Sequence, residues 1–295
     1  MNIFSFFSGA GFLDLGFELQ GNFNVVFVNE FHQAFNYVYQ YAREHMGINP
    51  PMYGHHVENI LHYLDGEHPE MLEELARLVD ESKHNQLTGF IGGPPCPDFS
   101  VAGRNRGQEG ENGRLSGTYC DLICETHPDF FVFENVKGLY RTARHRAFFE
   151  ELKQRFVEHG YYLTEQLINA LEYGAPQDRD RIILIGFSQE TVEELHLPVQ
   201  EHNLLDFPWE EHKIYNLEDV KALPWPVTNP YQENVPTVMP DGIIEELTVM
   251  HWWQQNDVEN HPNANMYFQP RAGLIRFQTK DEGDMERKCY KRLHR

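Results

Sequence analysis

Short apolar runs alternate with longer amphipathic runs over the first 187 residues of the chain. This alternation is typical of repeated strand–helix units, which build a mostly parallel sheet with helices on its faces. The pattern therefore predicts the α/β class. We expect strands over residues 3–7, 25–28, 87–91, 130–133, 161–167 and 182–187, and a short one ending near residues 55–57.

The amphipathic runs between these segments predict helices. The clearest covers residues 70–80, where apolar side chains recur at helical spacing, and a second covers about 147–159. After Phe187 the sequence becomes rich in proline, acidic and aromatic residues and loses its period. We therefore expect a boundary at about residues 188–200, with one domain over residues 1–190 and a smaller, irregular one over 191–295.

Composition and cysteine usage narrow the class of protein. The 295 residues are 41% hydrophobic, and no apolar run approaches the roughly 20 residues of a membrane-spanning helix. The amino terminus starts directly with a strand pattern and no export leader, so we expect a cytoplasmic protein and no membrane partner. The four cysteines form no CxxC pair, which argues against a disulfide framework or a zinc site. We expect no metal, and a monomer.

The formal net charge of -21 argues against a general nucleic-acid binder, because phosphate contacts need lysine and arginine. The acidic residues are concentrated between about positions 190 and 259, where only Lys213 and Lys221 are basic. Basic residues gather elsewhere, around positions 104–114, 137–146 and 271–295. A local positive surface near a functional site therefore remains compatible with the composition.

Cys96 lies in the run Gly-Gly-Pro-Pro-Cys that follows the predicted strand 87–91. Two glycines and two prolines must end that strand and form a stiff turn at its carboxyl end. Ligands of open parallel sheets bind at this edge, and a thiolate there is a candidate nucleophile. The alternative is a buried structural cysteine, although such residues usually lie inside apolar periodic segments.

A glycine turn follows the first strand. Ser8, Gly9, Ala10 and Gly11 can turn tightly and bring backbone amides close to a ligand. Glu30 follows the second strand about 20 residues later, the spacing at which an acid accepts hydrogen bonds from ribose hydroxyls. Together they suggest a cofactor of the adenosine type; the alternative is an ordinary turn and a surface glutamate.

Four segments, in this order, resemble the cytosine-C5 DNA methyltransferases: FSGAGFLDLGFE (residues 7–18), GGPPCPDFSVAG (92–103), FENVKGL (133–139) and YGAPQDRDRIILIGF (173–187). The resemblance implies a Rossmann-like, class I methyltransferase fold followed by a target-recognition region, and duplex DNA as partner. It implies S-adenosylmethionine as methyl donor and S-adenosylhomocysteine as product. It places the cofactor on the turn formed by Phe7, Ser8, Gly9, Ala10 and Gly11, with Glu30 on the ribose, Phe31 on the adenine, and further contacts from His56, Val57, Pro95 and Leu115.

The resemblance also implies the chemistry. Cys96 would attack C6 of a cytosine that has been flipped out of the duplex, because the duplex hides the reacting atom. Glu134 would bind N3 and the exocyclic amine of the base, while Asn135 would hold the loop. Arg179 and Arg181 would point toward O2 of the base and the cysteine loop.

The chain also departs from the family pattern. Phe12 stands where many members have a glycine, Pro97 and Asp98 replace a glutamine-containing pair, and His56 replaces an acid that often contacts the adenine. His56 could therefore face the adenine or lie on the surface. The family's closing Arg-Glu and Gly-Asn motifs are not found before Arg295, so we expect a recognition region that is truncated at its carboxyl end.

Two rival interpretations remain. The first is a tRNA cytosine methyltransferase of the same superfamily, which would share Cys96 and Glu134 but would lack a long recognition region. The second is a non-catalytic DNA-binding homologue, in which Cys96 would be dispensable. The resemblance favours a DNA enzyme from a bacterial restriction-modification system.

Overall fold

The computed structural model describes residues 1–84, 86–95, 111–223, 242 and 244–260. It contains two compact units. The first unit comprises residues 1–168 and 181–208, and the second comprises residues 169–180 together with the chain from 209 onward. Residues 169–180, a short internal segment, therefore belong to the same compact unit as the later part of the chain. The proposed division of function at residue 190 stays a prediction.

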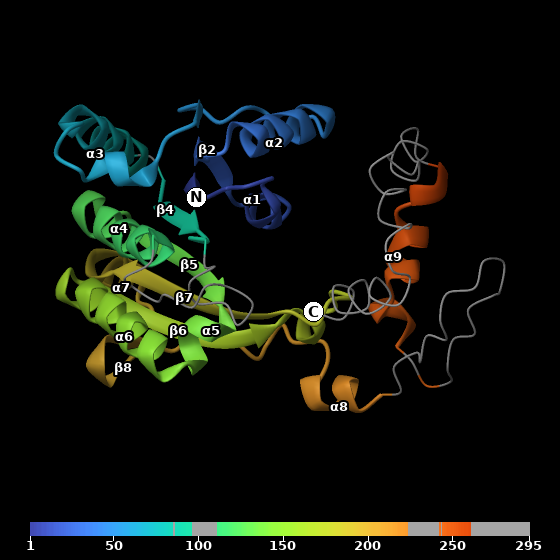
Figure 1. Cartoon of the computed structure of the whole chain (residues 1–295). Coiled ribbons are helices and arrows are strands. Elements are labelled where there is room, and N and C mark those ends of the chain that lie inside the picture. Colours follow the sequence, from blue (N-terminus) through green and yellow to red (C-terminus); the bar gives the residue numbers. More distant parts are fainter. Residues whose placement is uncertain (85, 96–110, 224–241, 243, 261–295) are drawn as a thin grey trace, which may run out of the picture. The chain divides into compact units, whose positions relative to one another are not determined.

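A sheet forms the centre of the first unit (Figure 1). Within the described residues its strand order is β3-β2-β1-β4-β5-β7-β6-β9-β8. The strands from β3 to β5 pair in parallel, whereas β7 is antiparallel to β5. The bounds are β1 Asn2–Phe6, β2 Asn24–Asn29, β3 His55–His56, β4 Thr88–Gly92, β5 Phe130–Val136, β6 Tyr161–Asn169, β7 Asp180–Ser188, β8 Val199–Gln200 and β9 Leu204–Leu205.

Each predicted strand is confirmed to within a few residues at its ends. The runs of β-branched and aromatic residues explain why, since strands buried on both faces need apolar side chains at successive positions. In β1, for example, Ile3, Phe4 and Phe6 are all buried. The mostly parallel α/β architecture expected from the sequence is confirmed.

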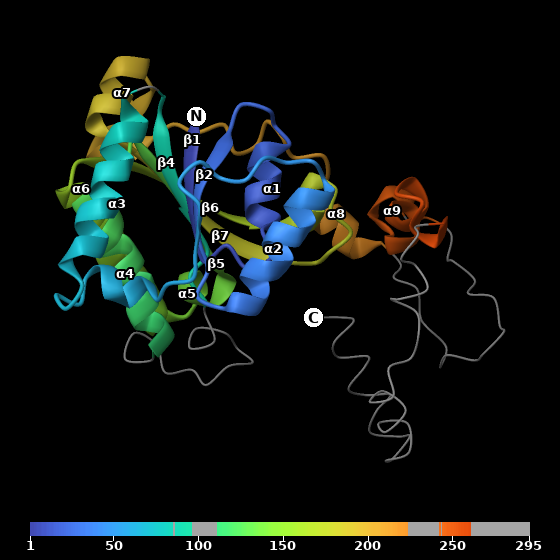
Figure 2. The same cartoon turned by 90° about the horizontal axis from the view of Figure 1, so that it is seen from above.

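Helices cover both faces of the sheet, as the view from above shows (Figure 2). One face packs against α3 (Pro69–Lys83), α4 (Glu111–Thr126) and α6 (Ala143–Glu158) around the larger aromatic core. The other face packs against α1 (Phe12–Glu18) and α2 (Gln33–His45). The two helices predicted at residues 70–80 and 147–159 correspond to α3 and α6.

Shorter elements complete the described chain. In the first unit these are η1 Ile60–Tyr63, α5 Lys137–Arg141, α7 Gln189–Leu195 and η4 Glu201–Asn203. In the second unit they are η3 Ala170–Tyr173, α8 Leu217–Ala222, η5 Glu245–Leu247, α9 Val249–Gln255 and η6 Val258–Asn260. Among the helices of the described residues, none has the length and apolar character needed to cross a bilayer.

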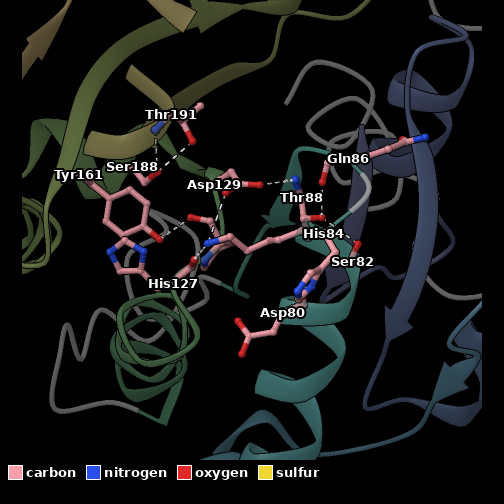
Figure 3. Close-up of polar contacts among 12 residues, drawn as sticks. Asp80, Ser82, His84, Gln86, Thr88, His127, Asp129, Tyr161, Ser188 and Thr191 are labelled. Carbon is pink, nitrogen blue, oxygen red and sulfur yellow. Dashed lines mark hydrogen bonds and ion pairs between the residues drawn. The ribbon is translucent and has the colours of Figure 1, made fainter. Parts of the chain in front are cut away.

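A network of hydrogen bonds joins the strands at the amino end of the parallel sheet (Figure 3). The side chain of Asp129, just before β5, accepts a hydrogen bond of 2.7 Å from the Thr88 amide at the start of β4. Its main-chain oxygen accepts one of 2.8 Å from the Ser188 amide at the end of β7. At the start of β6, the buried Tyr161 hydroxyl donates to the Pro128 carbonyl at 2.8 Å. These contacts hold the amino ends of β4, β5 and β6 and the carboxyl end of β7 together.

Candidate functional site

The glycine turn lies between the carboxyl end of β1 and the start of α1. Phe7, Gly9 and Gly11 all have positive φ angles, of 53°, 55° and 84°. Glycine adopts this conformation readily, whereas a bulky residue such as Phe7 does so at a cost. The sequence Ser-Gly-Ala-Gly thus permits a reversal in which the backbone is accessible to a ligand.

Glu30 follows β2 and contacts this turn directly. One carboxylate oxygen accepts a hydrogen bond from the Gly9 amide at 2.8 Å, and the other accepts one from the His32 amide at 2.8 Å. Glu30 is only 7% exposed. Because each carboxylate oxygen has two lone pairs, Glu30 can still accept hydrogen bonds from a diol. The structure therefore brings together the glutamate and the turn whose spacing suggested a cofactor site.

Two features of the turn fit a bound polar molecule. The Ser8 hydroxyl is buried and has no hydrogen-bond partner among the described residues, which is costly unless a ligand or water supplies one. A Cβ atom built at Gly9 would meet no atom of the described part of the chain within 4 Å, so space lies open beside the turn there. Phe31, next to Glu30, is 58% exposed and offers an aromatic surface for a flat ring. These residues fit an adenosine-type cofactor such as S-adenosylmethionine.

The remaining cofactor candidates lie at neighbouring strand ends. His56, in β3, stacks on Phe27 with a centroid distance of 4.4 Å, and its Nε2 lies 2.9 Å from the Tyr53 carbonyl oxygen. The same ring lines a pocket of about 590 Å³ between the β3 edge and α3. The His56 ring therefore contacts other residues and does not lie free on the surface. These contacts do not show a role in cofactor binding, so that role stays a prediction.

Val57 and Leu115 are both half-buried. Leu115, on α4, and Phe7, in the turn, pack against the same apolar core on the α4 side of the sheet. Leu115 therefore lies in the neighbourhood that the resemblance implied, and its contact with a cofactor stays a prediction.

The loop that leads to the proposed nucleophile begins at the end of β4. Pro94 is buried and Pro95 is exposed, whereas Cys96 itself lies outside the described residues, as do positions 97–110. The buried side chain of Asn135 donates to the Pro94 carbonyl oxygen at 3.4 Å and accepts a hydrogen bond from the Val136 amide at 2.8 Å. Asn135 therefore contacts the start of this loop, and its role in holding the loop stays a prediction.

Glu134 faces the same loop from β5. Its Oε1 forms an ion pair of 2.5 Å with Nε of Arg181 on β7. A Cβ atom at Gly93 would lie only 2.8 Å from its Oε2. The carboxylate of Glu134 is therefore held between the guanidinium of Arg181 and the backbone of Gly93. The three residues come from β5, from β7 and from the loop after β4, which lie far apart in the sequence.

Arg179 is placed differently from Arg181. It is exposed, precedes the first residue of β7, and belongs to the second unit. Its main-chain oxygen accepts a hydrogen bond from the Ala170 amide at 3.0 Å. Arg181 lies within β7, whereas Arg179 precedes it, and the roles of both arginines toward the base stay predictions.

A set of polar residues behind the glycine turn is not apparent from the sequence. Asp14 on α1 and Tyr39 and Arg43 on α2 are buried and hydrogen-bonded to one another or to the turn. The spacing of Tyr39 and Arg43 by four residues places them on one face of a helix, but their partners are more than 20 residues away. No local pattern in the sequence indicates that pairing.

Fold and site together define a Rossmann-like protein whose polar groups converge at the carboxyl end of the parallel strands. The model of the C-5 cytosine-specific DNA methylase family matches residues 1–241 of the chain. The chain belongs to this family, which confirms the resemblance of its four segments. The strand order, in which β7 runs antiparallel to β5 beside the parallel strands, agrees with the class I methyltransferase fold.

Several relatives are known. The chain is 53% identical over 296 residues to the Type II methyltransferase M.NmeDI of Neisseria meningitidis serogroup C, covering 99% of this chain and 66% of that protein. It is 33% identical over 190 residues to M.MthTI of Methanothermobacter thermautotrophicus, covering 64% and 50% of the two chains. It is 31% identical over 190 residues to M.FnuDI of Fusobacterium nucleatum, covering 64% and 48%. The chain thus spans about half to two thirds of the length of these relatives.

Proposed function

We propose that this protein transfers a methyl group from S-adenosylmethionine to C5 of a flipped-out cytosine in duplex DNA, through a covalent bond between Cys96 and C6. The observation that carries the proposal is the Glu134 carboxylate, held by Arg181 beside the loop that leads to Cys96. Membership of the family supports the same reaction.

The proposed reaction needs groups on both sides of the cytosine ring. C5 of cytosine is a weak nucleophile, and a bond between the Cys96 sulfur and C6 turns C5 into an enamine-like carbon. A carboxyl group that shares its proton with N3 and accepts a hydrogen bond from the exocyclic amine lets the ring accept the electron pair from sulfur. Once C5 is methylated, loss of its proton and of the Cys96 thiolate restores the aromatic ring.

Glu134 is suited to the contact with N3 because its carboxylate has a fixed direction. The Arg181 ion pair orients Oε1, and the second oxygen faces the Gly93 backbone at the edge of the cysteine loop. A guanidinium has five N–H donors, so Arg181 can hold Glu134 and still donate to O2 of the base. Both contacts would fix the plane of the base relative to Cys96.

The glycine turn would hold the methyl donor. Gly9 and Gly11 let the backbone approach it, the Ser8 hydroxyl offers an unused hydrogen bond, and Glu30 and Phe31 suit the ribose and the adenine. The bound donor supplies an electrophilic methyl group. The turn and the Glu134 side chain both lie at the carboxyl end of the parallel strands, which is where this fold class binds its ligands.

The relatives suggest a biological setting. M.NmeDI, M.MthTI and M.FnuDI are named Type II methyltransferases. We infer that this protein acts in the cytoplasm as the modification enzyme of a restriction-modification system. Residues 1–190 would carry the chemistry, and residues 191–295 would contribute to recognition of the target sequence.

A mechanism-based trap tests the proposal. The protein is incubated with tritiated S-adenosylmethionine and duplex DNA that contains 5-fluorocytosine, whose fluorine cannot leave as a proton does. We expect an adduct that survives denaturation and disappears in Cys96→Ser. The control is Cys289→Ser, because Cys289 lies beyond the family match at residues 1–241. An adduct on tRNA alone would favour the RNA enzyme, and no adduct on either substrate would favour the non-catalytic homologue.

A further inference from the structure

A buried polar network joins the glycine turn to β1, α1 and α2. The Asp14 carboxylate is its centre and is 0% exposed. One oxygen accepts a hydrogen bond from the Ser5 hydroxyl on β1, and the other accepts one from the Tyr39 hydroxyl on α2, both at 2.8 Å. A single carboxylate thus ties together the strand before the turn, the helix after it and the helix behind it.

Arg43 extends this network to the turn itself. Its Nη2 donates a hydrogen bond of 2.8 Å to the Gly11 carbonyl oxygen, and its Nε forms an ion pair of 2.9 Å with Glu18. The guanidinium lies 4.5 Å from the centre of the Tyr39 ring, and Arg43 is only 5% exposed. The planar guanidinium therefore serves three partners at once, which a lysine amine cannot do in the same way.

The Tyr39 ring fixes the turn by contact. A Cβ atom at Gly11 would lie 2.5 Å from Tyr39 Cε2, so the ring already occupies the space where a side chain would stand. The turn is consequently held at two points. Glu30 fixes the Gly9 amide from β2, while Arg43 and Tyr39 fix Gly11 from α2.

A buried, charged network is an expensive way to attach a helix to a sheet. Removing Arg43, Glu18 and the Asp14 carboxyl group from water costs free energy. Apolar residues of similar volume often stabilise a core equally well or better. What these polar groups add is direction, since each hydrogen bond fixes an angle as well as a distance. Two of the groups fixed in this way are the Gly11 carbonyl, in the glycine turn, and the Asp14 carboxyl group, in the first turn of α1.

We propose that Arg43, Tyr39 and Asp14 are positioning residues for the cofactor, which hold the glycine turn in the conformation that binds S-adenosylmethionine. The inference rests on the proposed function. If only a fraction of the molecules have the turn in its binding conformation, the apparent affinity for the cofactor falls by that fraction. Loosening the turn therefore weakens cofactor binding without changing any atom that touches the cofactor.

Two variants test this inference. Arg43→Gln removes the charge and the three-way contact, and Tyr39→Phe keeps the ring under Gly11 but loses the hydrogen bond to Asp14. Tyr161→Phe is the matched control, because it also removes one buried tyrosine hydroxyl, at the amino end of the sheet (Figure 3). Cofactor affinity is measured by equilibrium dialysis with tritiated S-adenosylmethionine, and stability by thermal unfolding.

We expect the Kd for S-adenosylmethionine to rise about tenfold in Arg43→Gln and about threefold in Tyr39→Phe, where tenfold corresponds to about 1.4 kcal/mol. Tyr161→Phe should lower Tm as much as Tyr39→Phe does and leave the Kd within a factor of about two. In methyl transfer, KM for the cofactor should rise while kcat at saturating cofactor is retained. Arg43→Lys, which keeps the charge beside Glu18, should recover part of the affinity.

The outcomes separate this inference from the proposed function. If the unaltered protein binds S-adenosylmethionine and the Kd of both Tyr39→Phe and Arg43→Gln matches that of the unaltered protein, the network is only structural and the inference is wrong. The same conclusion follows if Tyr161→Phe weakens binding as much as Tyr39→Phe. If the unaltered protein binds no S-adenosylmethionine, the proposed function itself is wrong and the inference falls with it.

Discussion

Gly93→Ala is a sharp test of the role of Glu134, because it moves the carboxylate without removing it. The added methyl group would lie 2.8 Å from Glu134 Oε2, closer than real Cβ contacts allow. Gly93 is not among the glycines with positive φ, so alanine is not strained by the backbone at this position. The atom that must give way is the far end of a flexible side chain, and the fold should therefore be retained.

The size of the effect follows from the geometry. Ordinary contact begins at 3.4 Å and the built distance is 2.8 Å, so Oε2 must move away by about 0.6 Å. A misplacement of about 1 Å at a reacting group costs about 100-fold in rate, and in proportion a shift of 0.6 Å costs roughly 15-fold. We expect kcat/KM for methyl transfer to fall by about this factor, which corresponds to about 1.6 kcal/mol of lost transition-state stabilisation.

The assay is tritium transfer to duplex DNA, read together with thermal unfolding. Gly16→Ala is the matched control, because Gly16 is an exposed helical residue of α1 whose Cβ position is open. It should keep full activity and raise the free energy of unfolding by up to about 1 kcal/mol. If Gly93→Ala transfers methyl groups at the rate of the unaltered protein, Glu134 does not act at this site in the observed direction and the reasoning is refuted.

Three further predictions concern stability. Gly186→Ala should destabilise the fold by about 1–3 kcal/mol, since its Cβ would overlap the buried Phe131 ring, and an unchanged urea midpoint would contradict this packing. Asp129→Ala should lower the free energy of unfolding by about 1–3 kcal/mol, because it leaves the buried Thr88 amide unpaired. Asp129→Asn keeps an acceptor and should lower it by less. Equal losses of stability in the two variants would contradict the role of this hydrogen bond. Burial lowers the pKa of His55, so the unfolded chain binds more protons below about pH 6.5 and stability should fall as pH drops through this range. The drop in Tm from pH 7 to pH 5 should be smaller in His55→Gln, and an identical drop would show that His55 does not cause it.

The sheet could be predicted from the sequence because its strands are local signals. Each is a compact apolar run bounded by glycine, proline or polar residues, and strands buried on both faces leave a strong pattern. The grouping of residues 169–180 with the second unit could not be predicted in this way. The segment lies between two strands of the sheet, so the strand pattern continues on both sides of it and no change of composition marks the boundary.

The site was predictable only in part, for a similar reason. Glycines, the loop of Cys96 and the position of Glu30 each follow a strand directly, and the parallel topology brings such positions to one edge. The pairing of Asp14 with Tyr39, and of Arg43 with the Gly11 carbonyl, spans 25 and 32 residues. Such long-range polar contacts depend on how α1 and α2 pack, and a single sequence carries no periodicity that reports it.

The amino end of the sheet contributes to stability, whereas the carboxyl end carries the proposed site. At the amino end, Asp129, Thr88 and Tyr161 saturate one another or the backbone with hydrogen bonds. At the carboxyl end, the Ser8 hydroxyl has no partner within the described residues, and Phe7 has a costly backbone conformation. Strain and unused polar groups persist in a fold only where the surrounding contacts hold them in place. The buried network on α2 supplies such contacts, so the energetic cost at one edge of the sheet is itself an argument that this edge binds a ligand.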